Sequence, residues 1–211
     1  MSSRRTSGRY ADGPYLEWTK YKENMIVTFY TPTPGSGIKE ANHVDVLERQ
    51  DNQVVEFTFA LFKKMYSDHP HMSWYLKLDD DSLLFPTNFM HHLASLNPNQ
   101  AVMGGHLKYD GIFSGGAGYF LSNSVLQMLV ERASECLKQH VPNRLLGGPE
   151  DVIVSLCVKH FFGDQLVQVH IQEMYPLTYE NMWYPQRTRT TWTWRMDCFR
   201  RPHVCSMVQA S

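Results

Sequence analysis

Three consecutive carboxylates follow a short apolar run near the middle of the chain. Residues 74–78 are rich in aromatic and aliphatic side chains, and Asp79, Asp80 and Asp81 come directly after them. Like charges this close repel one another, and a divalent cation is the usual means of holding them together. Mn²⁺ and Mg²⁺ prefer such oxygen ligands and commonly hold substrate phosphates as well. The alternative is a solvated turn in which Asp caps the next helix.

A glycine-rich segment is the second candidate, and it comprises Gly115, Gly116, Ala117 and Gly118. Small residues let a ligand approach the backbone closely and tolerate unusual backbone angles. The segment is not the dinucleotide fingerprint, which needs G-x-G-x-x-G between a strand and a helix. A tight turn or bulge before a strand explains the glycines equally well.

Two acids, Glu150 and Asp151, follow Pro149 and form the third candidate. Proline suits the first helical turn and acids favour the positive end of a helix, so this pattern predicts a helix start. An acid in this place could serve as a general base if it reaches the proton to be removed. Ordinary stabilisation of the helix dipole is the alternative explanation.

Alternating strands and helices are expected to position these three groups. We expect strands at 25–30, 74–78, 101–103 and 166–171, and helices at 54–66, 89–96, 124–138 and 150–160. The intervening residues 31–37 and 142–148 are expected to be loops. The alternation predicts an α/β domain with a mostly parallel central sheet. In such sheets ligands collect at the carboxyl ends of the strands.

Length and composition fit one globular domain. The chain has 211 residues, 43% of them hydrophobic, and its 20 basic and 21 acidic residues give a net charge of −1. Because a basic excess is missing, no nucleic-acid partner is predicted. No apolar run approaches the ~20 residues of a membrane span. We expect a disordered lead at 1–14, a domain at 15–185 and an irregular tail at 186–211.

The four cysteines all lie in the last 76 residues of the chain: Cys136, Cys157, Cys198 and Cys205. They permit two disulfides with three connectivities. None forms a C-x-x-C pair, which argues against a zinc site. Free buried thiols are the alternative.

In order and spacing, these motifs resemble glycosyltransferase family 31, which includes Fringe and the core 1 β1,3-galactosyltransferases (T-synthases). The resembling segments are Trp74-Tyr75-Leu76-Lys77-Leu78-Asp79-Asp80-Asp81, Gly104 with Ser114-Gly115-Gly116-Ala117-Gly118-Tyr119-Phe120-Leu121-Ser122, and Glu150-Asp151 followed by Cys157. They fall within residues 50–176. Among members, the core 1 enzymes look most similar, because of the Ser-Gly-Gly-Ala-Gly-Tyr-x-Leu-Ser string and of the arrangement of Cys136, the acids and Cys157.

The resemblance implies a GT-A (Rossmann-like) fold, a UDP-galactose donor and Mn²⁺ as cofactor. Asp79 and Asp80 would lie near the ribose of the nucleotide, and Asp81 would bind the metal together with Asp79. The metal would bridge the diphosphate and neutralise the leaving UDP. The residues lining the sugar pocket would be Gly115, Gly116 and Ala117.

For the reaction itself, the resemblance implies that Asp151 is the general base that removes a proton from the acceptor hydroxyl. One displacement would invert the anomeric centre and place β1,3-linked galactose on N-acetylgalactosamine of glycoprotein Ser or Thr, the core 1 step of O-glycosylation. Relatives of this kind are type II Golgi membrane enzymes, so a lumenal domain is implied, with a glycoprotein or glycopeptide acceptor. A homodimer is possible, and the sequence leaves this question open.

Two alternatives remain beside the core 1 interpretation. A Fringe-like β1,3-N-acetylglucosaminyltransferase would keep the chemistry and change the sugar. A catalytically silent relative would act as a partner or chaperone. The last interpretation draws on Tyr175, which occupies the position of the family's late metal-ligand histidine. It also draws on the family pattern at the front, where the first strand and the membrane anchor would precede residue 1.

Overall fold

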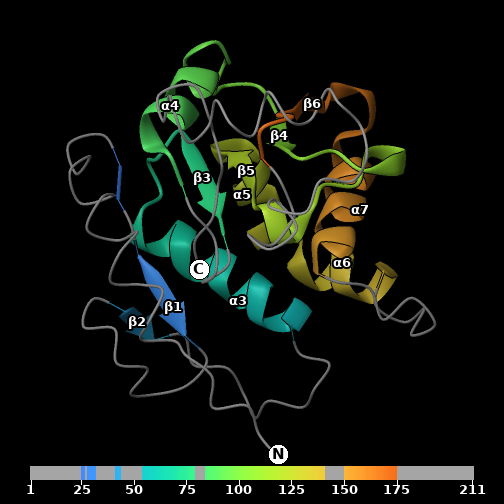
Figure 1. Ribbon diagram of the computed structural model, residues 1–211. Coiled ribbons are helices and arrows are strands. Elements are labelled where there is room, and N and C mark those ends of the chain that lie inside the picture. Colours follow the sequence, from blue (N-terminus) through green and yellow to red (C-terminus); the bar gives the residue numbers. More distant parts are fainter. Residues whose placement is uncertain are drawn as a thin grey trace, which may run out of the picture.

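The structure, a computed structural model, describes residues 25–26, 28–31, 41–43, 54–78, 84–140 and 150–174 (Figure 1). The expected lead, tail and 142–148 loop, as well as Asp79, Asp80, Asp81 and Tyr175, lie outside the described residues. The strands are β1 (Phe29–Thr31), β2 (Ala41–His43), β3 (Trp74–Lys77), β4 (Val102–Gly105), β5 (Tyr119–Ser122) and β6 (Val167–His170). The α-helices are α3 (Val54–Asp68), α4 (Pro86–Ala94), α5 (Asn123–Glu131), α6 (Ala133–His140) and α7 (Glu150–Phe162). Three 3-10 helices are η2 (Tyr109–Gly111), η3 (Gly115–Ala117) and η5 (Gly163–Gln165).

Among the described residues, the central sheet has four strands in the order β3-β5-β4-β6, and β1 and β2 form a separate parallel pair. The strand β5 runs antiparallel to both β3 and β4, whereas β4 and β6 are parallel. The expectation of a mostly parallel sheet is therefore wrong, although the α/β class and a Rossmann-like arrangement agree with the structure. The physical reason is that 106–118 joins β4 to β5 without an α-helical crossover, so the chain returns in the opposite direction.

The strands β3, β4 and β6 nevertheless share one direction, because β3 and β4 both run opposite to β5. Their carboxyl ends meet at one edge of the sheet, where β5 begins. The described residues that include β3 end at Leu78, directly before Asp79. We call this side of the sheet the carboxyl edge.

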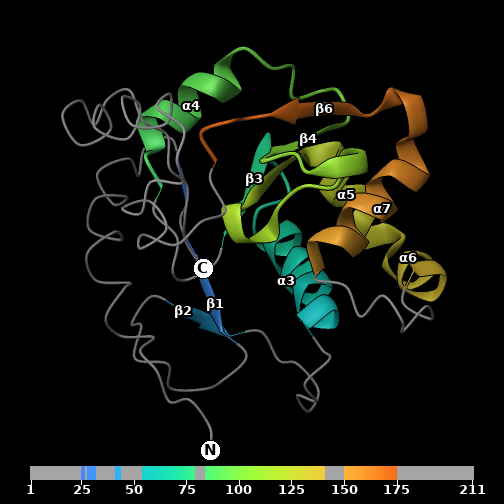
Figure 2. The same cartoon turned by 45° about the vertical axis from the view of Figure 1, so that its right-hand side comes forward.

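Alternate residues of each strand face two different hydrophobic layers. Tyr75, Met103 and Leu121 pack on one face against α3, α5, α6 and α7. Trp74 and Phe120 pack on the opposite face against α4. Figure 2 shows α4 on one side of the sheet and the other four helices on the other side. The helix α7 thus brings its first turn to the carboxyl edge.

Helix positions follow the expected ranges with two differences. The helix α4 begins at Pro86 rather than at 89, because proline fits the first helical position. The expected helix at 124–138 is two helices, α5 and α6, separated at Arg132. Tertiary contacts account for the turn: a disulfide joins Cys136 to Cys157 of α7, and the guanidinium of Arg132 lies over the ring of Phe161.

Close packing requires a glycine in β4, which extends to Gly105 rather than ending at 103. The ring of Phe120 covers the backbone of Gly104, its partner in the β4–β5 register. A Cβ atom on Gly104 would lie 2.1 Å from Cζ of Phe120. The same ring makes edge contacts with Trp74 and Phe89, so one glycine allows an aromatic cluster to form over the sheet.

Candidate active site

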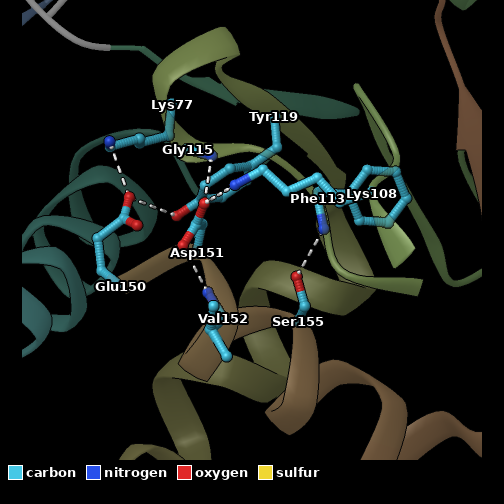
Figure 3. Close-up of polar contacts among 9 residues, drawn as sticks. All are labelled: Lys77, Lys108, Phe113, Gly115, Tyr119, Glu150, Asp151, Val152 and Ser155. Carbon is cyan, nitrogen blue, oxygen red and sulfur yellow. Dashed lines mark hydrogen bonds and ion pairs between the residues drawn. The ribbon is translucent and has the colours of Figure 1, made fainter. Parts of the chain in front are cut away.

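Two buried acids open α7 at the carboxyl edge, and each is paired with a lysine from another element (Figure 3). Glu150 pairs with Lys77 at the end of β3, and Asp151 pairs with Lys108 in the turn between β4 and β5. The predicted helix start at these acids is confirmed. Adjacent acids in one helical turn therefore face two different parts of the sheet edge.

Asp151 accepts hydrogen bonds on both carboxylate oxygens. Its Oδ2 accepts from the backbone N–H of Gly115 at 2.7 Å and from Nζ of Lys108 at 3.2 Å. Its Oδ1 accepts from the N–H of Val152 at 2.8 Å. An ionised carboxylate offers about four acceptor sites, and donors among the described residues use three of them, which leaves one on Oδ1. That position is where a proton can be received without displacing a donor.

Glu150 makes the more enclosed ion pair. Nζ of Lys77 lies 2.8 Å from Oε1 of Glu150, and the two side chains are only 10% and 6% exposed. The hydroxyl of Tyr119 donates to the same oxygen at 3.5 Å, and the Lys77 ammonium lies 5.9 Å from the centre of the Tyr119 ring. Both charges are thus compensated inside the protein, as buried charges must be.

The glycine-rich segment divides between the site and the core. A Cβ on Gly115 would lie 3.1 Å from both Cβ of Asp151 and Oε2 of Glu150, so a larger residue here would crowd the start of the helix. Gly116 is exposed, and a Cβ there would meet nothing within 4 Å. Ala117 is fully buried in the layer beneath α4. Of the three residues predicted to line a sugar pocket, Gly115 is the one in contact with the acids.

Lys108 reaches Asp151 from a turn that is held by several hydrogen bonds. The backbone N–H of Phe113 donates to Oγ of Ser155 in α7 at 3.1 Å. The side chain of Gln168 donates to the carbonyl of Gly111 at 3.1 Å, and Lys159 donates to the carbonyl of Asp110. Lys108 itself is 41% exposed, so its ammonium lies between the buried carboxylate and solvent.

Two histidines extend the carboxyl edge at the ends of β4 and β6. The ring centres of His106 and His170 lie 5.3 Å apart, and the N–H of Leu107 donates to Nδ1 of His170 at 3.0 Å. Burial lowers the pKa of His106, and the neighbouring His170 lowers it further. This part of the edge therefore favours a neutral imidazole at His106.

The metal prediction concerns residues that the structure does not describe. Among the described residues, no three His, Cys, Asp or Glu side chains come together in a way that could hold an ion. The contiguous carboxylates Asp79, Asp80 and Asp81 suit Mn²⁺ or Mg²⁺ by their chemistry, because these ions prefer oxygen ligands. Within the described segments, no helix combines the length and apolar character needed to cross a membrane.

The roles of Lys77, Lys108 and Ser155 at this site are not predicted from the sequence. For Lys77 a signal exists: the two-residue alternation of a strand places it on the same buried face as Tyr75, where a charge needs a partner. Lys108 and Ser155 carry no comparable signal, since one lies in a turn and the other is an ordinary small residue in a helix.

Comparison with known proteins gives a distant relationship. No protein-family model matches the chain. Chondroitin sulfate synthase 3 from Homo sapiens and from Mus musculus is 27% identical to it over 139 residues. The match covers 59% of this chain and 15% of each relative, so the chain spans a small part of their length. The similarity supports a glycosyltransferase in general. It does not single out family 31.

Proposed function

We propose that this chain is a metal-dependent inverting glycosyltransferase domain that transfers galactose from UDP-galactose to N-acetylgalactosamine on glycoprotein Ser or Thr. The observation that carries the proposal is Asp151, a buried carboxylate at the carboxyl edge that accepts from three donors among the described residues, two of them on Oδ2. The distant similarity to a glycosyltransferase and the resemblance of the motifs support the same chemistry.

In the proposed reaction, the 3-hydroxyl oxygen of the acceptor forms a bond to the anomeric carbon of the donor sugar. The bond between that carbon and the β-phosphate oxygen breaks, and its electron pair leaves with UDP. Oδ1 of Asp151 takes the hydroxyl proton, since Oδ2 already accepts from Gly115 and Lys108. A single displacement inverts the centre, so an α-linked donor yields a β-linked product.

Asp79, Asp80 and Asp81 would hold Mn²⁺ and the nucleotide in this scheme. When bound, Mn²⁺ neutralises charge on the departing diphosphate as a Lewis acid. We propose that Gly115 also contacts the donor sugar. Its backbone N–H donates to Asp151, so a sugar bound at Gly115 would lie beside the proposed base. Gly116 is open to solvent and can also be reached by a donor.

The Cys136–Cys157 disulfide supports placement of the domain in an oxidising compartment, because disulfides are rare where thiols are kept reduced. The Golgi lumen is the compartment we propose, in keeping with a glycoprotein acceptor. One disulfide confirms that at least two of the four cysteines are paired.

Transfer to a chondroitin acceptor is the second candidate function, and the observation favouring it is the similarity to chondroitin sulfate synthase 3. The two candidates share a UDP-sugar donor and the proposed base. They differ in the acceptor, so an acceptor panel separates them.

The experiment begins with calorimetric titration of the full chain with UDP, with and without Mn²⁺. Transfer is then assayed from a panel of UDP-sugars to an N-acetylgalactosaminyl peptide and to a chondroitin oligosaccharide. Galactose transfer to the peptide supports the first proposal, and transfer to the oligosaccharide supports the second. A folded chain that neither binds UDP with Mn²⁺ nor transfers sugar would favour the silent partner.

Asp151→Asn tests the base directly. We expect UDP binding to stay within about twofold while transfer falls by about 100-fold or more, the usual range for loss of a general base. Asp164→Asn is the matched control, because Asp164 is an exposed acid in η5 away from the acid pair. An Asp151→Asn protein as active as that control would rule out this role for Asp151.

A further inference from the structure

We propose that Lys77 and Glu150 are positioning residues that fix the carboxylate of Asp151 relative to the end of β3. The inference rests on the proposed role of Asp151 as the base. It assigns a function to the Lys77–Glu150 ion pair, which we call the inner pair. In the proposed reaction this pair takes no direct part in the proton transfer or in the attack on the anomeric carbon.

The pair joins the two places where the proposed chemistry would be anchored. Lys77 is the last residue of β3, two positions before Asp79, and Glu150 is the first residue of α7, one position before Asp151. The 2.8 Å contact between their charged atoms therefore connects the strand that leads to the acid triplet with the helix that carries the base.

Stability alone gives little reason for an ion pair at this position. Replacing a buried pair by apolar side chains of similar volume is often neutral or stabilising, because desolvation offsets the attraction of the charges. An ion pair differs from apolar packing because a shifted register between helix and strand would leave both charges buried without a partner, so the pair disfavours such shifts. The hydroxyl of Tyr119 also donates to Glu150, so a second element helps to fix the position of that carboxylate.

The surroundings of the pair leave Asp151 little tolerance. Gly115 lies so close to both acids that even a Cβ would be crowded, and its N–H donates to Asp151 at 2.7 Å. Further attachments of α7 come later in the helix, at Ser155 and Cys157. With a rise of about 1.5 Å per residue, Cys157 lies about 10 Å along the axis from Glu150. Apart from the contact of Lys108 with Asp151 itself, the Lys77–Glu150 pair is thus the ion pair nearest the base among the described residues.

The Gly115 amide provides a readout of Asp151 that does not depend on activity. In Glu150→Gln and in the double variant Lys77→Met/Glu150→Leu, we expect hydrogen exchange at this amide to become about tenfold faster, as for a lost hydrogen bond. The amides of Met103 and Leu121 in the sheet report whether the fold is intact. Lys64→Met is the matched control, since it breaks an ion pair with Asp68 on α3.

Turnover gives the second readout. We expect kcat of the double variant to fall by about 10- to 100-fold with KM for the donor within about twofold, because misplacing a reactive group affects the chemical step. Glu150→Gln, which can still accept from Lys77, should retain more activity than the double variant. Lys64→Met should behave like the unmodified protein.

The two readouts separate this inference from the proposed function. Unchanged protection of Gly115 in a double variant whose sheet amides remain protected would overturn the positioning role. If protection is lost while the unmodified protein transfers no sugar from any donor, the pair positions Asp151 and the proposed function fails. Full kcat in a variant with a loosened Gly115 amide would also overturn the inference.

Discussion

The two ion pairs at the start of α7 differ in how far their side chains are exposed to solvent. In the inner pair, Lys77 and Glu150 are 10% and 6% exposed, whereas in the outer pair Lys108 is 41% exposed and Asp151 only 3%. Neighbouring acids of one helical turn are thus given different surroundings, and different surroundings can give like carboxylates different roles. Both side chains of the inner pair are enclosed, whereas in the outer pair the cation is partly solvated.

Removing one partner of the inner pair should have the largest effect on stability. Lys77→Met leaves the Glu150 carboxylate buried without its ammonium partner, and we expect a loss of about 3–5 kcal/mol in the free energy of unfolding. Urea denaturation measures this difference. The double variant Lys77→Met/Glu150→Leu should recover most of the loss, because no charge is then left buried. A single variant as stable as the unmodified protein would contradict the enclosure of this pair.

Removing the cation of the outer pair should cost far less. Asp151 is buried, but Lys108 is partly solvated and two backbone donors share the carboxylate, so the contribution of Lys108 should lie near that of exposed pairs, about 0.2–1 kcal/mol. We therefore expect Lys108→Met to lower the free energy of unfolding by less than about 1 kcal/mol in the same urea titration. The backbone N–H groups of Gly115 and Val152 remain on Asp151 in that variant. A loss as large as that of Lys77→Met would show that the two pairs contribute equally to the free energy of unfolding, despite their different exposure.

The elements that the sequence predicts well are those set by local patterns. The apolar spacing from Val54 onward predicts α3, and the Pro-Glu-Asp sequence predicts the start of α7 at Glu150. The strand β5 is predicted only within the alternative that the glycines form a turn or bulge before a strand, and its pairing depends on the distant β3 and β4.

The candidate site shows the same limit more sharply. Asp151 and Gly115 are found by residue type and motif, but the hydrogen bond between them joins positions 36 residues apart. Lys77 meets Glu150 only because the sheet and α7 pack together. Side-chain partners of this kind are set by tertiary structure, so a strand-end lysine predicts the need for a partner without naming it.

Acidification should produce the smallest effect, and it should act at His106 on the carboxyl edge. Burial and His170, with a further contribution from Lys108, lower the pKa of His106 in the folded protein. The unfolded chain then binds this proton more readily, so the stability linked to His106 is present above the ordinary pKa of about 6.5 and is lost as pH falls through the folded value. We expect thermal unfolding of the unmodified protein to become easier between neutral and mildly acid pH, and His106→Gln to flatten that dependence. His140, whose pKa is also lowered by burial and by His160, should contribute separately, so the variant lacking both histidines should show the flattest profile. If the thermal stability of His106→Gln fell as steeply with acidification as that of the unmodified protein, a group other than His106 would account for the pH dependence.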